Sequence, residues 1–295
     1  MTGGRGRSTL NPQPSTGWVE VGGGLKLSYR EWSGQGAPIA FLHGLASNAR
    51  IWDQVAARLA PRFRVVAVDQ RGHGQSDKPP DGYDFETVVA DASAAFERLG
   101  IVRPVLVGHS WGGNVALHFA ADADPPPRAL VLVDGGFIEL ARRMSWPAAE
   151  ERLRPPNTDV PVEQFRRRIR DRLGPRWSPA WEEAILGNFW VDPDGVLRRN
   201  LSVENHMGIL RHLYEHRPTA LFGRVRCPIL VVVAQPPGEA GGRSDREESV
   251  RAILAEAEPL CDLRVVWMPD TLHDVPLDRP DELAGLIAEA AGLSS

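Results

Sequence analysis

The sequence predicts an α/β fold, with a mostly parallel sheet of about eight strands, helices on both faces and an inserted helical cap. Three observations lead to this prediction. Short apolar runs alternate with longer segments of helical period. One apolar run leads into a G-x-S-x-G turn at Ser110 and then into a helix. One interval of about 90 residues between two strands is too long for an ordinary crossover.

The predicted strands are short apolar runs bounded by turn residues, and the segments between them repeat apolar residues at helical spacing. Gly22, Gly23 and Gly24 separate the first two strands, which predicts an opening hairpin. In chain order the strands are 18–21, 25–32, 38–42, 64–68, 104–107, 129–133, 229–234 and 263–268. The helices are 49–59, 85–99, 112–121, 245–257 and 280–291.

Composition divides the chain into three parts. Residues 1–16 are rich in Gly, Pro, Ser and Thr, which predicts a disordered N-terminal arm. Residues 135–223 separate two sheet strands and contain helical stretches with their own aromatic residues, so we expect a mainly helical cap. Residues 17–134 and 224–295 then form the core domain.

The charge balance favours a small-molecule partner. The chain has 34 Lys and Arg against 38 Asp and Glu, a net charge of -4, without the basic excess that nucleic acid or an anionic membrane would favour. No run approaches the roughly 18 apolar residues of a membrane span, and no signal peptide is evident, so we expect a soluble, cytoplasmic protein. Cys227 and Cys261 are expected to be reduced thiols, with no disulfide framework or metal site.

The most specific chemical signal is the segment VLVGHSWGG at 105–113, which has Ser110 at its centre. A nucleophile at a strained strand-to-helix turn needs small neighbours, because bulk two positions away would clash as the backbone reverses. A serine hydroxyl also needs a neighbouring base. His273 follows the last predicted strand, and loops after strand ends are where such sheets place site residues. We predict Ser110 as nucleophile and His273 as general base.

An oxyanion hole in this arrangement uses the amide after the nucleophile and one amide from an earlier loop. Trp111 and Leu45 are the residues in those positions. His43 begins the earlier loop, and we expect it to be a hydrogen-bonded loop former, not a base.

Three motifs together resemble the α/β hydrolase superfamily, in particular its capped branch of esterases, C–C hydrolases, epoxide hydrolases and haloalkane dehalogenases. They are the pair His43-Gly44, the segment DQRGHGQS at 69–76 and the turn around Ser110. The likeness runs from about residue 18 to 293 and weakens in the cap. It implies that 69–76 is a structural loop beside the oxyanion region. Epoxide hydrolases and dehalogenases use an aspartate nucleophile, whereas this chain has serine.

The acid that orients the histidine should lie between Ser110 and His273 in chain order. In most relatives, the resemblance implies, this acid follows the strand after the cap. Here the strand 229–234 runs into Gln-Pro-Pro, so the usual position lacks an aspartate.

A substitute stands at the end of the preceding strand. The strand 129–133 runs into Asp134, and some members of the superfamily take their acid from this strand end. We therefore predict Asp134 as the acid that orients His273. Glu239 is the alternative, followed by Asp245 or another residue, and a weak or inactive enzyme without an acid is the remaining possibility.

The cap offers aromatic side chains for a pocket. They would either line an apolar site or pack the cap against the core, and both interpretations stay open. The arginine-rich run 166–172 is interpreted as a solvated helix face, since the cap holds 14 Arg against 12 acidic residues. The candidate substrate-binding residues are Trp146, Trp177, Trp181 and Trp190.

These residues predict a carboxylesterase-like serine hydrolase that cleaves an ester or related acyl bond of a small, largely apolar substrate through an acyl-enzyme on Ser110. Such chemistry needs no cofactor and no metal. A C–C bond hydrolase, lactonase, thioesterase or amidase would use the same groups. A ligand-binding protein on a hydrolase scaffold is the alternative from another class.

Overall fold

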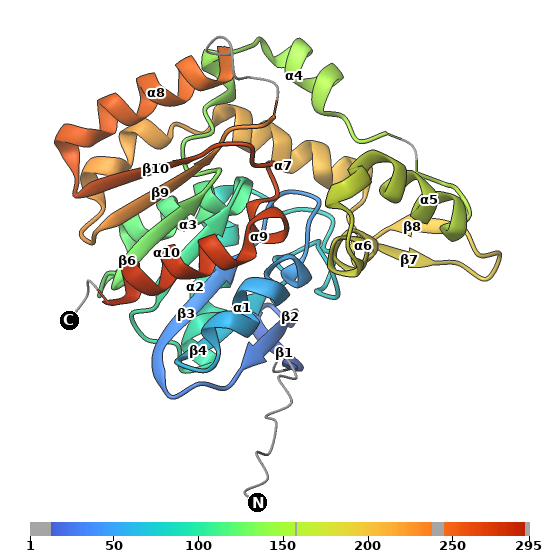
Figure 1. The fold of residues 1–295 in the computed structure, drawn as a ribbon, viewed down its shortest axis with the longest axis horizontal. Coiled ribbons are helices and arrows are strands. Elements are labelled where there is room, and N and C mark those ends of the chain that lie inside the picture. Colours follow the sequence, from blue (N-terminus) through green and yellow to red (C-terminus); the bar gives the residue numbers. More distant parts are fainter. Residues whose placement is uncertain (1–12, 157, 238–244, 293–295) are drawn as a thin grey trace, which may run out of the picture.

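The computed structural model describes residues 13–156, 158–237 and 245–292. Within these residues eight strands form one sheet in the order β1-β2-β4-β3-β5-β6-β9-β10 (Figure 1). Neighbouring strands from β4 to β10 are parallel, whereas β2 pairs antiparallel with both β1 and β4. The predicted fold class is therefore confirmed. The strands are β1 (Ser15–Gly22), β2 (Leu25–Trp32), β3 (Gly36–Leu42), β4 (Phe63–Val68), β5 (Val105–His109), β6 (Ala129–Val133), β9 (Ile229–Ala234) and β10 (Leu263–Met268).

The first strand begins earlier than the sequence predicted. Ser15 and Thr16 fall in the predicted disordered arm, yet they belong to β1 and pair with Glu31 and Arg30 of β2. This part of β1 is polar and exposed, so it carries no apolar signal. Residues 1–12 of the predicted arm lie outside the described residues.

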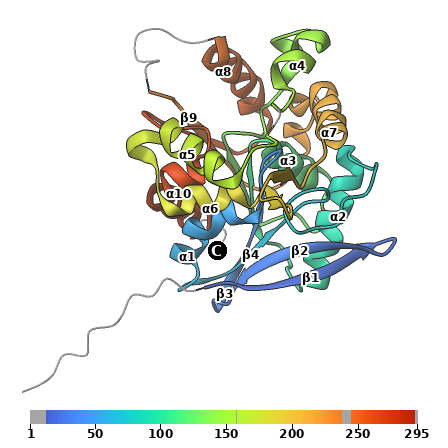
Figure 2. The same ribbon diagram turned by 90° about the vertical axis from the view of Figure 1, so that its right-hand side faces the viewer.

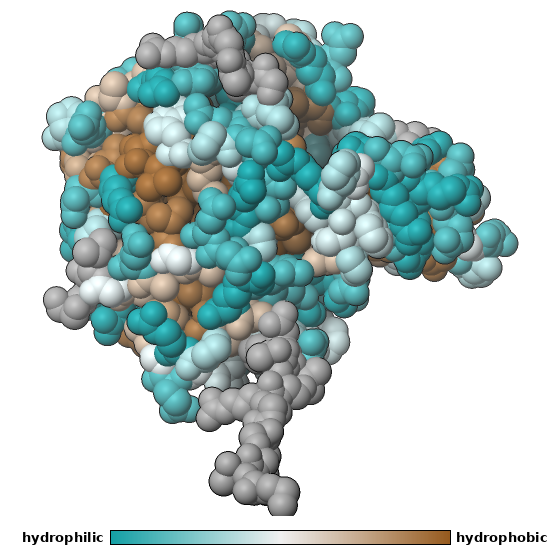
Figure 3. Space-filling view, in the orientation of Figure 1, coloured by the Kyte–Doolittle hydropathy of each residue, from teal (hydrophilic) through white to brown (hydrophobic). Residues whose placement is uncertain are grey.

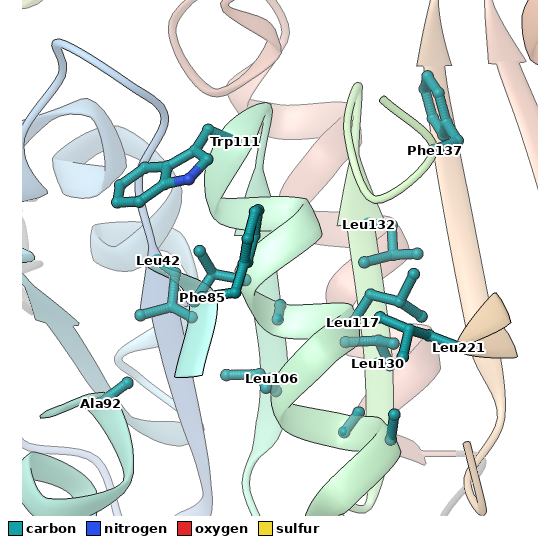
Figure 4. Packing of buried hydrophobic residues seen from close by; sticks show 14 of the residues in the cluster. Leu42, Phe85, Ala92, Leu106, Trp111, Leu117, Leu130, Leu132, Phe137 and Leu221 are labelled. Carbon is teal, nitrogen blue, oxygen red and sulfur yellow. The ribbon is translucent and has the colours of Figure 1, made fainter. Parts of the chain in front are cut away.

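Helices cover both faces of the sheet (Figure 2). Alternate strand residues point to opposite faces, so Leu106 of β5 packs with α2, α3 and α8, while Val105 and Val107 pack with α1 and α10. Figure 4 shows the first of these two clusters, with Leu106 and Leu130 of the sheet beside Leu117 of α3. The core helices are α1 (Asp53–Leu59), α2 (Phe85–Arg98), α3 (Trp111–Asp122), α8 (Asp245–Ala257), α9 (Val275–Asp278) and α10 (Pro280–Gly292).

The interval between β6 and β9 forms the cap. It includes a two-stranded sheet that the sequence did not predict, because strands of three residues are too short to show a period. The region around α5, on the right of Figure 3, is largely hydrophilic on the face in view. The cap elements are α4 (Trp146–Leu153), α5 (Val162–Leu173), α6 (Pro179–Leu186), β7 (Phe189–Val191), β8 (Leu197–Arg199) and α7 (Val203–Glu215).

Short 3₁₀ helices complete the described chain. They are η1 (Ala49–Trp52), η2 (Leu140–Arg142), η3 (Gly174–Arg176), η4 (Pro218–Ala220), η5 (Phe222–Arg224) and η6 (Glu258–Leu260). Among the helices of the described ranges, none combines the length and the apolar character that crossing a membrane requires.

Candidate active site

Ser110 occupies a strained turn between β5 and α3. Its φ is 54°, in the left-handed region that a non-glycine residue rarely adopts. A Cβ at Gly108 would lie 2.2 Å from the carbonyl oxygen of Gly112, and a Cβ at Gly112 would lie 2.3 Å from that of His43. The two glycines of the motif therefore allow the backbone to reverse here and to present the serine at the carboxyl end of the sheet.

The structure brings the three predicted triad residues together. The Nε2 atom of His273 lies 3.0 Å from the Oγ atom of Ser110, and its Nδ1 atom lies 2.5 Å from Oδ2 of Asp134. An ionised carboxylate only accepts hydrogen bonds, so the Nδ1–H of His273 donates to Asp134. Its Nε2 is then unprotonated and accepts the hydroxyl hydrogen of Ser110.

Asp134 reaches His273 because of the strand order. It directly follows β6, which lies beside β9 with Val133 paired to Val232. Its Oδ1 accepts the backbone N–H of Ala234, at 3.0 Å, so this carboxylate from β6 reaches the end of β9.

Of the two alternative acids, only Asp245 belongs to the described residues, and it does not contact His273. Asp245 is exposed at the start of α8, whereas the next residue, Arg246, donates from Nη2 to Oδ1 of Asp134 at 2.5 Å. Glu239 lies outside the described residues. Sequence reasoning missed Arg246, since a contact between α8 and the end of β6 leaves no local pattern.

Electrostatics favour an ionised Asp134 beside a basic His273. Burial raises the pKa of Asp134, but His273 and Arg246 lower it more, so the net pKa is below the ordinary value. Desolvation lowers the pKa of His273, but the hydrogen bond and charge of Asp134 outweigh it, and the net pKa is raised. The imidazole is therefore a stronger base than a free histidine side chain.

The two predicted oxyanion residues flank the nucleophile. A Cβ at Gly44 would lie 3.0 Å from Cβ of Ser110, so the loop after β3 approaches the serine closely. Leu45 in that loop and Trp111 line the same cavity as Ser110. The amide of Trp111 is the first of α3, and the first amides of a helix have no intrahelical acceptor.

The segment 69–76 supports both of these residues. The Nε2 atom of His73 accepts the N–H of Ala46 at 3.2 Å, and its ring stacks on Trp111 with centroids 5.5 Å apart. Burial lowers the pKa of His73 to about 3, so the ring is neutral and can accept. The carboxylate of Asp69 accepts the backbone N–H of Ala49 at 2.7 Å, so this side chain has a structural role.

Two further histidines are held neutral by burial. His43 accepts the N–H of Gln70 at 3.0 Å, and burial lowers its pKa to about 4. His109 also has a pKa lowered to about 4, mainly by burial, and its Nε2 lies 2.9 Å from the carbonyl oxygen of His273. That carbonyl only accepts, so His109 donates from Nε2 and ties the His273 loop to the nucleophile turn.

A cavity of about 330 Å³ opens onto Ser110 and His273 in the described part of the chain. Aliphatic and aromatic side chains from the cap and the adjoining core form much of its wall. They include Phe137, Ile138, Leu140, Leu153, Leu210 and Leu213. A second cavity, of about 250 Å³, also reaches Ser110 and His273 and is lined by Ile185 and Phe189 of the cap.

The four cap tryptophans named from the sequence line neither of these two cavities. Trp181 is buried, and Trp190 is 53% exposed. Trp146 packs against the ring of Tyr214, and Trp177 donates to Glu182 within the cap. Each of the three partly or fully buried rings is used in packing, so the tryptophans of the cap do not identify its pocket residues.

Comparison with known proteins identifies the family. The family model of the alpha/beta hydrolase fold matches residues 37–200, more than half of the chain. This chain belongs to the α/β hydrolase fold family. The match includes Ser110 and Asp134 and ends before His273.

Curated relatives match part of the chain. A non-heme chloroperoxidase of Streptomyces lividans is 39% identical over 111 residues, 37% of this chain and 40% of the relative. A 2-(acetamidomethylene)succinate hydrolase of Mesorhizobium japonicum is 38% identical over 112 residues, 38% of this chain and 40% of the relative. The chain thus spans 40% of the length of each of these two relatives.

Among solved structures, E-2-(acetamidomethylene)succinate hydrolase superposes with a TM-score of 0.76 at 25% identity, covering 95% of this chain and 99% of the other. The likeness in fold therefore extends over the cap as well as the core.

Proposed function

We propose that the protein is a serine hydrolase that cleaves a carboxylic ester, or a related acyl bond, of a small substrate through an acyl-enzyme on Ser110. One observation carries this proposal: the continuous hydrogen-bonded series from Ser110 through His273 to Asp134, open to a cavity of about 330 Å³. Membership of the α/β hydrolase fold family and a relative named as a hydrolase support it.

In the proposed first half-reaction, the Oγ of Ser110 attacks the carbonyl carbon while Nε2 of His273 takes the hydroxyl proton. Asp134 stabilises the imidazolium, and the amides of Leu45 and Trp111 bind the oxyanion. The tetrahedral intermediate then collapses, the bond to the leaving group breaks, and the leaving oxygen receives the proton from His273. Ser110 is left as an ester of the acyl group.

In the second half-reaction, water takes the place of the leaving group. His273 removes a proton from the water, the hydroxide attacks the acyl carbon, and the same two amides bind the second oxyanion. Collapse returns the proton to Oγ of Ser110 and releases the carboxylic acid. The raised pKa of His273 suits it to both proton transfers near neutral pH.

A substrate panel tests this proposal. Purified protein is assayed with 4-nitrophenyl esters of short and medium acids, with lactones and with vinylogous diketones. We expect ester hydrolysis in the wild type and a loss of at least about 10³-fold in kcat for Ser110→Ala. A folded wild type that hydrolyses none of these compounds, or a Ser110→Ala variant that keeps its activity, overturns the proposal. Turnover of the diketones alone would instead favour a C–C bond hydrolase.

A further inference from the structure

Arg143 is a cation in the wall of the catalytic cavity. It follows η2 directly and lines the cavity of about 330 Å³ together with Ser110 and His273. Within the described ranges its guanidinium forms no ion pair, whereas Arg142 beside it binds Glu139 at 3.1 Å and Glu256 at 2.6 Å. Arg143 thus presents a positive charge that has no ion-pair partner among the residues that the structure describes.

The other charged residues of this cavity have partners of opposite charge. Glu139 is buried and pairs with Arg142. Arg246 donates to Asp134 and to the carbonyl oxygen of Ala234. Arg143 differs from these residues because it has no ion-pair partner among the described residues.

The surroundings of Arg143 favour the binding of an anionic ligand. Partial burial lowers the pKa of Arg143, the positive charges of Arg246 and Arg152 lower it further, and Asp245 raises it. A guanidinium stays protonated in proteins despite such shifts. An anion bound at Arg143 would relieve the repulsion among these arginines, and a planar carboxylate can take two of its N–H groups at once.

The second cavity offers a contrast. Arg172 lines it and also forms no ion pair within the described ranges, but Asp274 lies in the same wall. That wall therefore holds one charge of each sign.

Apolar side chains such as Phe137 and Leu213 make up much of the wall of the Arg143 cavity. A ligand of that cavity would combine an apolar segment with one anionic end.

We propose that the acyl substrate carries a carboxylate, separated from the scissile carbonyl by an apolar segment, and that Arg143 binds this carboxylate. The identity of the scissile bond rests on the proposed function above. The proposed recognition of the carboxylate does not rest on that function, because it needs only the cavity and Arg143.

Calorimetric titration of the Ser110→Ala protein tests this binding without turnover. The ligands are monomethyl adipate and monomethyl suberate, each compared with its dimethyl ester, which has nearly the same shape and no charge. We expect the monoacid of at least one pair to bind about 10-fold tighter than the diester, the gain typical of a charge-assisted hydrogen-bonded pair. Adding Arg143→Met should reduce this preference to less than about threefold.

Matched variants separate Arg143 from general charge effects. Arg172→Met removes an unpaired arginine from the other cavity, and Arg152→Met removes a charge that lies in neither cavity. Both should keep the preference for the monoacid. Arg143→Lys keeps the charge without the planar fork and should retain part of the preference.

Three outcomes overturn the proposal: no ligand of the series binds at millimolar concentration, monoacid and diester bind equally, or the preference survives Arg143→Met. Circular dichroism of each variant ensures that a folded protein is compared. If the monoacid preference depends on Arg143 while wild-type protein hydrolyses none of the panel, the proposed function fails and the carboxylate site stands.

Discussion

Replacing Asp134 by Asn changes the buried carboxylate that contacts His273. The side chain of Asp134 is 1% exposed and holds Nδ1–H of His273 and the guanidinium of Arg246, each at 2.5 Å. An Asn keeps the size but removes the charge. It therefore leaves the imidazolium without its counter-charge during catalysis, and it leaves Arg246 without its carboxylate.

We expect kcat of Asp134→Asn to fall by about 10³- to 10⁴-fold. That loss corresponds to about 4–5.5 kcal/mol of transition-state stabilisation. Its size is consistent with losing one charged hydrogen bond, worth about 1.5–3 kcal/mol, together with the preferred tautomer of His273.

The pH profile gives a second readout. Asp134 raises the pKa of His273 against an opposing desolvation. The base acts only when neutral, so activity is lost as the pH falls through this raised pKa. Without the carboxylate the pKa of His273 falls, and the acidic limb of kcat/KM moves to lower pH.

Steady-state hydrolysis of a 4-nitrophenyl ester across pH measures both effects. Asp245→Asn and Glu239→Gln are matched controls that remove the two alternative carboxylates, both of which follow β9 in the sequence. Full turnover in Asp134→Asn, with a loss of orders of magnitude in either control, would refute the assignment of the acid.

The remaining predictions concern groups around the triad. Arg246 lowers the pKa of both Asp134 and His273, so Arg246→Gln should move the acidic limb of kcat/KM to higher pH, and a shift to lower pH contradicts this. His73→Leu removes the acceptor for Ala46 and the stack on Trp111, and kcat should fall about 10-fold with a smaller change in KM; an unchanged kcat argues against support of the oxyanion loop. Gly112→Ala would place a Cβ 2.3 Å from the carbonyl oxygen of His43, and chemical denaturation should show a loss of about 3 kcal/mol or more in the free energy of unfolding. A Cβ at Gly285 in α10 would meet open space, so Gly285→Ala should raise the free energy of unfolding by about 0.5–1 kcal/mol. Equal stability of the two alanine variants would disprove the steric argument.

Buried parallel strands were predicted most accurately from the sequence. The bounds of β6 and β9 agree with the predicted ranges, because a strand covered on both faces reads as a continuous apolar run. The bounds of the edge strand β10, which is only partly buried, also agree. Exposed or very short segments were missed. The exposed start of β1 and the short pair β7 and β8 are held by backbone pairing, which leaves little trace in the side chains.

Some residues of the candidate site could likewise be predicted from the sequence, whereas others depend on long-range packing. Ser110 and His273 follow from a local motif and from position after a strand, both of which are properties of the sequence. That the carboxylate of Asp134 contacts His273 depends on β6 lying beside β9, two strands separated by the whole cap. Arg143 and Arg246 likewise reach the cavity through long-range packing, so no local pattern marks them.

Active-site labelling tests the central claim, a nucleophilic Ser110, most directly. Folded wild-type protein is treated with a fluorophosphonate, digested, and mapped by mass spectrometry. The account predicts one equivalent of phosphonate on the peptide that contains Ser110, slower labelling in His273→Ala and none in Ser110→Ala. An unlabelled wild type, or labelling that persists in Ser110→Ala, would contradict it.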